Sequence, residues 1–335
     1  METVTQYIVW RFLLWEKRMK KYWITKLAQL LVVMLLISFF SYGVIYAAPG
    51  DISDVYVRAD MTQEQRDAVR ESLGMDKSMP EQYLAWLGKA VKGDLGISLV
   101  NKASVTQQFI DRLPATLLLM GTSLILALIL AIPLGLIAGI KKNTWIDNLI
   151  SGISYIGMSM PSFWLGMLLI ILFTANLHIL PSSGMHTIGS ESAWDTFKHL
   201  IMPGITLSLA NLATFIRYIR TNAVGQMSEE YVLTAKAKGT SAKGILFGHV
   251  MRNTLLPIIT LVGMNLATLV CGSFIVESVF GWPGIGTLTM TAIGSRDYPI
   301  IMAYVLLSGF ILVVGNFVAD ILYMVVDPRI RRGMK

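Results

Sequence analysis

Long apolar stretches without charged residues recur along the chain and predict membrane-spanning helices. A helix needs about 20 mostly apolar residues to cross a bilayer. The stretches that meet or approach this length are residues 27–48, 113–140, 149–175, 200–216, 253–276 and 298–319. The third stretch continues without charge to residue 190, so we expect an uncharged loop around residues 181–184 after its helix. The pattern predicts an all-α integral membrane protein with six transmembrane helices.

Composition supports the membrane interpretation and excludes several other classes. Of the 335 residues, 54% are hydrophobic and only 15% are charged, whereas soluble domains carry about 25% charged residues. Such a chain is too apolar to be soluble or disordered. The single cysteine, Cys271, excludes a disulfide framework and a Cys-based zinc site. The four histidines are irregularly spaced, so we expect no metal site.

Lysine and arginine are distributed unevenly around the predicted spans. Eighteen of the 28 basic residues fall on the side of both termini, and eight of the other ten lie in the long segment 49–112. Cytoplasmic loops are rich in Lys and Arg, whereas long loops are translocated largely regardless of charge. We therefore expect both termini in the cytoplasm and residues 49–112 outside, between spans 1 and 2. The net charge of +7 is then a topological signal and not a nucleic-acid footprint.

The predicted spans contain no constellation of residues that suits catalysis. Only Glu277 and Asp320 come near a span interior, and both lie close to a span end. The chain also lacks the Gly-x-x-x-x-Gly-Lys-Ser/Thr loop that binds nucleotide phosphates. We expect no catalytic residue and no cofactor in this chain. A secondary, ion-coupled transporter is an alternative class, but such carriers usually bury acidic or histidine relays near the midplane and contain inverted repeats.

The predicted cytoplasmic loop 217–252 contains signals for two short helices. Ser228 can cap the first helix, and the two glutamates that follow suit the positive end of its dipole. Gly239 can end this helix in a left-handed conformation. Thr240 or Ser241 can then cap the second helix.

One face of the first predicted helix combines an aromatic residue with two small ones. Tyr231, Ala235 and Gly239 follow i, i+4, i+8 spacing and therefore share that face. Another protein could approach closely there. The same pattern fits an amphipathic helix lying on lipid headgroups equally well.

The sequence around this loop resembles that of a known transporter family. Residues 231–239 read Tyr-x-x-Thr-Ala-x-Ala-x-Gly and residues 252–257 read Arg-Asn-x-Leu-Leu-Pro. Both are similar to the cytoplasmic signature of the peptide and nickel branch of ABC importer permeases. Further motifs of this branch follow in register along about residues 27–328. They include Ala-Pro-Gly-Asp at 48–51, Arg-Leu-Pro-Ala-Thr at 112–116, Pro-Ser-Phe-Trp-Leu-Gly at 161–166 and Glu-x-Val-Phe-Gly-Trp-Pro-Gly at 277–284.

The resemblance implies a domain organisation of the type I ABC importer permease class. The expected segments are a basic cytoplasmic extension 1–26, transmembrane helix 1 at 27–48, an extracytoplasmic segment 49–112, a transmembrane domain 113–327 with helices 2–6 and the coupling loop 217–252, and a cytoplasmic tail 328–335. The extension contains three tryptophans among basic residues, and we expect it to form an interfacial helix on the cytoplasmic leaflet.

The resemblance also implies a function and a set of partners. Such a permease imports peptides by alternating access across the cytoplasmic (inner) membrane of a prokaryote. It works with a second homologous permease, two ABC ATPases that bind the ATP, and an extracytoplasmic solute-binding protein. Membrane lipid is a further partner, and no nucleic acid is expected. Nickel or a metal chelate is the alternative substrate within the same family.

Two groups of site residues follow from the resemblance. The expected ATPase-coupling residues are Glu229, Glu230, Tyr231, Ala235, Lys236, Ala237, Lys238 and Gly239. The expected residues of an outer gate or binding-protein contact are Glu277, Trp282 and Pro283. For Glu277, a carboxylate that simply rests at the membrane interface is the competing interpretation.

Overall fold

The computed structural model describes residues 2–47, 61–72, 76–190 and 192–326, and these are almost entirely helical. Within them, β-structure is limited to one isolated bridge between Ile97 and Ser104. The chain forms two compact units. The first contains the described residues up to Thr106 together with Asp297–Phe317, and the second contains Gln107–Arg296 with the rest of the last helix.

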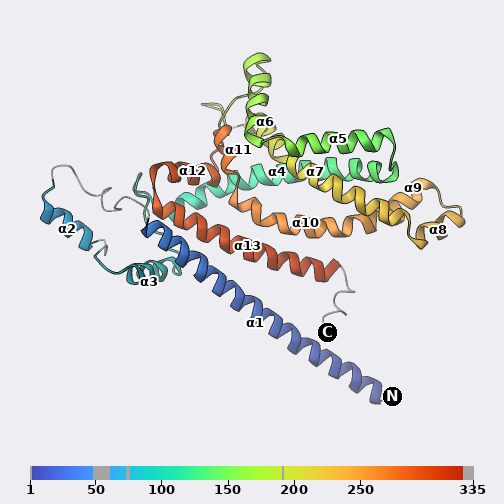
Figure 1. Ribbon diagram of the computed structural model, residues 1–335, viewed down its shortest axis with the longest axis horizontal. Helices are drawn as coiled ribbons and strands as arrows, with labels where there is room; N and C mark the ends of the chain where they lie inside the picture. The colour runs from blue at the N-terminus through green and yellow to red at the C-terminus, as the bar shows by residue number, and fades with distance from the viewer. Residues whose placement is uncertain (1, 48–60, 73–75, 191, 327–335) are drawn as a thin grey trace. The chain divides into compact units, whose positions relative to one another are not determined.

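The first unit is built from α1 (Glu2–Tyr46), α2 (Gln63–Ser72), α3 (Met79–Ala90) and the first part of α13 (Tyr298–Val326) (Figure 1). Helix α1 runs without a break through the basic N-terminal extension into the first span. The extension is therefore helical, but it is not a helix separate from the span. Its interfacial position remains a prediction.

Aromatic side chains join α1 to α3. Phe39 and Tyr42 of α1 make edge contacts with Tyr83 of α3, with ring centroids 5.3 and 5.8 Å apart. The hydroxyl groups of Ser38 and Tyr83 form a hydrogen bond of 2.8 Å. Helix α3 is thus attached to the first predicted span by a small aromatic core.

The second unit consists of a longer series of helices. They are α4 (Val105–Ile140, which starts in the first unit), α5 (Trp145–Ser159), α6 (Ser162–Leu169), the π-helix η2 (Ile170–Asn176), α7 (Ala193–Met227), α8 (Glu230–Ala237), α9 (Ala242–Ile245), the π-helix η3 (Leu246–Val250), α10 (Met251–Cys271), α11 (Phe274–Val279) and α12 (Ile285–Ser295).

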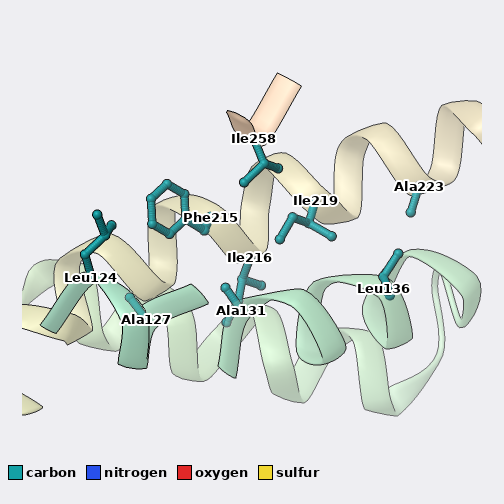
Figure 2. Packing of buried hydrophobic residues seen from close by; sticks show 9 residues of the cluster. All are labelled: Leu124, Ala127, Ala131, Leu136, Phe215, Ile216, Ile219, Ala223 and Ile258. Carbon is teal, nitrogen blue, oxygen red and sulfur yellow. The ribbon is translucent and has the colours of Figure 1, made fainter. Parts of the chain in front are cut away.

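The main core of the second unit lies where α4 packs against α7. Figure 2 shows Ala127 and Ala131 of α4 facing Phe215 and Ile219 of α7, with Ile258 of α10 beside them. Small residues let the two backbones approach closely, as is typical of membrane helices. A Cβ atom placed on Gly139 of α4 would lie 2.6 Å from the Cβ of α7 residue 223. Larger residues there would separate the helices.

The predicted spans are confirmed in number only if one bent helix pair is counted as a span. Five helical segments are long and apolar enough to cross a membrane: Ile24–Tyr46, Val105–Ile140, Ala193–Met227, Lys243–Gly263 and Tyr298–Val318. The sixth candidate is the pair Trp145–Ser159 and Ser162–Asn176, which is bent by 99°.

The span predicted over residues 149–175 is therefore not one continuous helix but a pair of helical segments joined at a bend. The break falls at Met160, whose backbone is extended (φ −82°, ψ 124°), directly before Pro161. A proline disfavours the helical conformation of the residue before it. In Figure 1, α5 and the α6–η2 segment run in different directions. The expected uncharged loop around residues 181–184 is confirmed, because these residues lie outside any helix.

Two further span boundaries differ from the prediction. Helix α4 begins at Val105, within the segment expected to be extracytoplasmic loop. Helix α10 ends at Cys271, because Gly272 adopts a positive φ of 73° and the chain turns into α11. Glu277 thus lies on a separate short helix and not at the end of the fifth span.

Candidate functional site

The coupling segment, residues 228–250, begins with a sharp break after α7. Ser228 is the C-terminal cap of α7, and Glu229 is the N-cap residue of α8. The prediction that Ser228 caps the first loop helix is therefore wrong by one position. Ser241 does cap the second helix, because its side-chain oxygen accepts a hydrogen bond from the Gly244 N–H.

The predicted left-handed end of α8 at Gly239 is confirmed. Its φ is +75°, and its N–H donates to the carbonyl oxygen of Lys236. The Thr240 N–H donates to the carbonyl oxygen of Ala235 at 3.1 Å. These two bonds form a Schellman motif, which satisfies carbonyl groups at the helix end. The path of the chain between α8 and α9 is thus fixed by the backbone itself.

A small core holds the coupling segment together. Val232 and Ala235 of α8 are buried against Ile245 and Val250. The predicted outward face of Tyr231, Ala235 and Gly239 therefore needs a correction, because Ala235 is only 7% exposed. Helix α8 instead buries part of this face against its own chain. The apolar partners are Ile245 of α9 and Val250 of η3.

The aromatic residue of the segment is also engaged within the chain. Tyr231 is partly buried, and its hydroxyl donates to Oε1 of Gln226 at 2.6 Å. Its ring centroid lies 6.3 Å from that of His249. Tyr231 is therefore a link between α7, α8 and η3.

The solvent-facing side of α8 carries the other predicted coupling residues. Glu229, Glu230, Lys236, Ala237, Lys238 and Gly239 are all exposed. Leu233 is exposed as well, at 58%. Leu233 was not among the predicted coupling residues. Helical periodicity could have identified it, because it lies two residues from both Tyr231 and Ala235 and therefore on the opposite side of the helix.

The Glu277 carboxylate lies in a closed pocket of backbone groups, and its residue is 0% exposed. Oε1 accepts a hydrogen bond from the Ser273 N–H at 3.2 Å and lies 3.4 Å from the Thr116 hydroxyl. Oε2 accepts from the Thr287 N–H at 3.0 Å. Because Thr287 is in the first turn of α12, the carboxylate stabilises the N-terminus of that helix.

Glycines make room for this carboxylate. Cβ atoms placed on Gly272 or Gly284 would each lie 2.4 Å from a Glu277 carboxylate oxygen. A Cβ on Gly286 would lie 2.8 Å from Oε2. We refer to Glu277, Thr116 and these three glycines as the Glu277 cradle. It joins the start of α4 to α11 and α12.

The turn after α11 is tied to the same place. The indole N–H of Trp282 donates to the carbonyl oxygen of Ala115 at 2.8 Å, and Trp282 is fully buried. Pro283 is exposed. A direct contact of Glu277 or Trp282 with a binding protein is thus not available in this structure, since both side chains are enclosed. A role of the cradle in an outer gate remains a prediction.

An ion pair that the sequence did not indicate joins α5 to α7. Nε and Nη2 of Arg220 donate to the two carboxylate oxygens of Asp147, at 2.5 and 2.7 Å. Asp147 is buried and also accepts from the Asn143 N–H at 2.9 Å. The sequence offered one signal for this pair: Asp147 stands at the start of an apolar stretch. A buried carboxylate in such a place needs a cationic partner.

Within the described residues, no three His, Cys, Asp or Glu side chains lie close enough together to hold a metal ion.

The chain matches two related protein families along most of its length. Residues 131–332 match the family described as "Binding-protein-dependent transport system inner membrane component". Residues 19–120 match the family of the corresponding N-terminal region.

Curated relatives are similar over nearly their whole length. The oligopeptide transport system permease protein AppB of Bacillus subtilis is 40% identical over 93% of this chain and 99% of its own length. The glutathione transport system permease protein GsiC of Escherichia coli K12 is 35% identical with the same coverage.

A solved structure shares the fold. It shows the MetNI methionine ABC transporter in inward-facing conformations, and its similar chain has a TM-score of 0.53 at 19% identity. The match covers 66% of this chain and 97% of that chain. The expected fold class, a multi-span all-α permease of the type I importer kind, is confirmed by these findings together.

Proposed function

We propose that this chain, which belongs to the family of binding-protein-dependent transport system inner membrane components, is the permease subunit of an ATP-driven peptide importer. It is a multi-pass membrane protein of the ABC permease type. Its relatives include an oligopeptide permease and a glutathione permease, which supports a peptide as the substrate class. The permease itself carries no catalytic residue in this proposal.

The observation that carries the proposal is the construction of the coupling segment. Its inner side chains form a core, its turn is fixed by a Schellman motif, and its outer face is exposed. A rigid element of this kind suits the transfer of movement from a partner ATPase to the membrane helices. Because α8 follows α7 directly and η3 leads directly into α10, a displacement of α8 moves both spans.

In the proposed mechanism, two ATPase subunits bind ATP and dock on the coupling segment. Their closure rotates α7 and α10 and exposes the translocation path to the outside. A solute-binding protein delivers the peptide there, and a second homologous permease completes the path. The ATPase subunits supply the nucleotide-binding loop that this sequence lacks.

A charge placed at Leu233 tests the docking of the ATPases. Leu233→Asp should abolish most recovery of the partner ATPases in a pull-down and the ATP-dependent import of labelled oligopeptide into proteoliposomes. Its folded stability should remain unchanged, because Leu233 is 58% exposed. The matched control is Leu84→Asp on α3, where the leucine is 63% exposed. Undiminished ATPase recovery with Leu233→Asp would contradict the coupling assignment.

The same proteoliposomes test the substrate and the energy source. Import of oligopeptide should require ATP and should persist when ion gradients are collapsed. ATP-dependent import of nickel without peptide import would overturn the peptide assignment. Loss of import on collapse of the gradient would instead indicate an ion-coupled transporter.

The orientation of the chain has its own test. We propose that both termini and the coupling segment are cytoplasmic and that α3 is extracytoplasmic. Single cysteines at the exposed positions Ser78 and Ser241, in a Cys271→Ala background, should react from opposite sides of intact cells. Labelling of Ser78→Cys only after permeabilisation would show that the topology is wrong.

A further inference from the structure

A recess of about 200 Å³ with both polar and apolar lining residues lies between α5 and α7 in the second unit. Its wall on α5 includes Asn148, Ser151 and Tyr155, and its wall on α7 includes Arg217 and Arg220. The recess thus places two arginines beside amide and hydroxyl groups. Ionisable groups on spanning segments indicate a functional site more often than a structural accident.

The charges in the recess are unequal. Asp147 neutralises Arg220 through a two-pronged hydrogen bond, and Arg220 keeps 29% of its side chain exposed. Arg217 is exposed, and its guanidinium carbon lies over the Tyr218 ring, 5.9 Å from the ring centroid. The recess therefore offers an arginine whose charge is not used by Asp147. An oxyanion is the ligand that such a group recognises.

The recess is level with one end of the membrane helices. Arg220 binds Asp147 in the first turn of α5, next to the turn between α4 and α5 that carries the exposed Lys141 and Lys142. Arg217 lies one turn further into the span on α7. Phosphate groups of lipids are found at this depth, and basic pockets between helices on the cytoplasmic side bind acidic headgroups.

An apolar groove adjoins the recess. It has a volume of about 600 Å³ and follows the bend between α5 and α6, where it is lined by Ile156, Phe163 and Trp164. The recess carries positive charge, the groove is apolar, and Tyr155 lines both. This combination suits a molecule with an anionic headgroup and a hydrocarbon tail.

We propose that this composite site binds an acidic phospholipid. The phosphodiester contacts Arg217 and the exposed part of Arg220, and an acyl chain lies along the groove at the bend. The Asp147–Arg220 pair positions Arg220 for this contact. The bound lipid fills the space that the 99° bend opens beside α5 and thereby supports the bent form of this span. The site does not depend on which substrate is transported.

The test uses the full-length chain purified with its partners, in nanodiscs of phosphatidylcholine with or without phosphatidylglycerol of the same acyl chains. Native mass spectrometry counts retained lipid, and thermal unfolding reports stabilisation. Arg217→Gln should reduce the apparent affinity for phosphatidylglycerol about tenfold or more, the factor expected for one charge-assisted contact. The control Lys142→Gln removes an exposed basic charge outside the recess and should retain the lipid. Equal losses in both variants would indicate general surface attraction and would overturn the proposal.

Further arms separate the possible sources of the oxyanion. Glycerol phosphate, which has no acyl chain, should not replace the lipid, and Trp164→Ala should weaken retention of lipid without changing its headgroup preference. Stabilisation by glycerol phosphate alone would indicate a site for small anions and would contradict the groove. The substrate arm compares import of peptides with free and amidated C-termini. If Arg217→Gln changes that ratio while lipid retention stays normal, the recess binds the substrate carboxylate and the lipid proposal fails.

Discussion

The Glu277 cradle and the coupling segment use glycine in opposite ways. In the cradle, Gly284 has an ordinary φ of −97°, and its lack of a side chain leaves space for the Glu277 carboxylate. In the coupling segment, Gly239 has a φ of +75°, and a Cβ there would meet nothing within 4 Å. The first glycine is required by packing and the second by backbone conformation.

The two regions also differ in what they leave for a partner. The Glu277 carboxylate accepts hydrogen bonds from Thr116, Ser273 and Thr287 and is enclosed. The coupling segment satisfies its backbone internally but exposes charged side chains and Leu233. An enclosed polar group stabilises an arrangement of helices, whereas a rigid element with an exposed face suits contact with another protein. The following substitutions test this distinction.

The largest effect should come from Gly284→Ala. The new Cβ would lie 2.4 Å from Oε2 of Glu277 and 2.6 Å from Oγ1 of Thr116. Overpacking costs about 1–3 kcal/mol, and displacement of the carboxylate leaves a buried N–H unsatisfied at a similar cost. We expect a loss of thermal stability and of purified yield. Gly294→Ala on α12 is the control, because nothing lies within 4 Å of its Cβ, and it should be neutral or stabilising.

A smaller loss is expected for Glu277→Gln. The amide keeps the size of the side chain but replaces one acceptor oxygen with a donor group, which then faces a backbone N–H. The expected cost in unfolding free energy is about 1–3 kcal/mol, measured by thermal unfolding in detergent. The control Glu230→Gln, on the exposed side of α8, should have no measurable effect on the unfolding free energy. A Glu277→Gln variant of normal stability that has lost stimulation by loaded binding protein would favour a direct gating role.

Substitutions of two neighbouring residues of α8, Val232 and Leu233, should affect stability and ATPase binding separately. Val232 is fully buried, so Val232→Ala should destabilise the segment by about 1–2 kcal/mol through the loss of two buried methyl groups. Leu233→Ala should leave stability within about 0.5 kcal/mol of the wild type but reduce ATPase recovery. Thermal unfolding and pull-down of the same samples make the comparison. If Leu233→Ala is the less stable variant, the assignment of inner and outer faces is wrong.

The smallest effect on global unfolding among the destabilising variants is expected for Gly239→Ala, because its cost is confined to one turn. A residue with a Cβ pays about 1–2 kcal/mol in the left-handed region, and the site is open, so no steric clash is added. The cost should appear as faster hydrogen exchange at the α8–α9 turn with little change in global unfolding. Gly239→Asn should restore part of the loss, because asparagine tolerates this conformation better than alanine does. An identical exchange rate for both variants would argue against the backbone explanation.

The sequence predicted local features of the site more accurately than it predicted their exposure. The left-handed stop at Gly239 was predicted, and Ser241 was one of the two residues predicted to cap the second helix. Both features depend on residues only a few positions apart. The burial of Ala235 was not predicted, because the residues that cover it, Ile245 and Val250, lie outside its own helix. Periodicity identifies the residues that share a face but not what covers that face.

Long-range partners account for the other differences. The Arg220 partner of Asp147 is far away in the sequence, and Thr116 meets Glu277 only because α4 packs beside α11 and α12. The bend at Pro161 was open to prediction from the proline itself, but a continuous apolar run concealed it.

The sequence alone determined that this is a helical membrane protein, where most of its apolar helices lie, and which transporter family it resembles. These properties follow from composition, helix length and short motifs, and each depends on residues close together in the chain. Tertiary structure alone decided that Glu277 and Trp282 are enclosed, that Leu233 is exposed on α8, and that Arg217 and Arg220 share a recess with α5. Burial and ion pairing are properties of surfaces brought together by packing, because a side chain's surroundings are set by helices whose contacts no local pattern encodes.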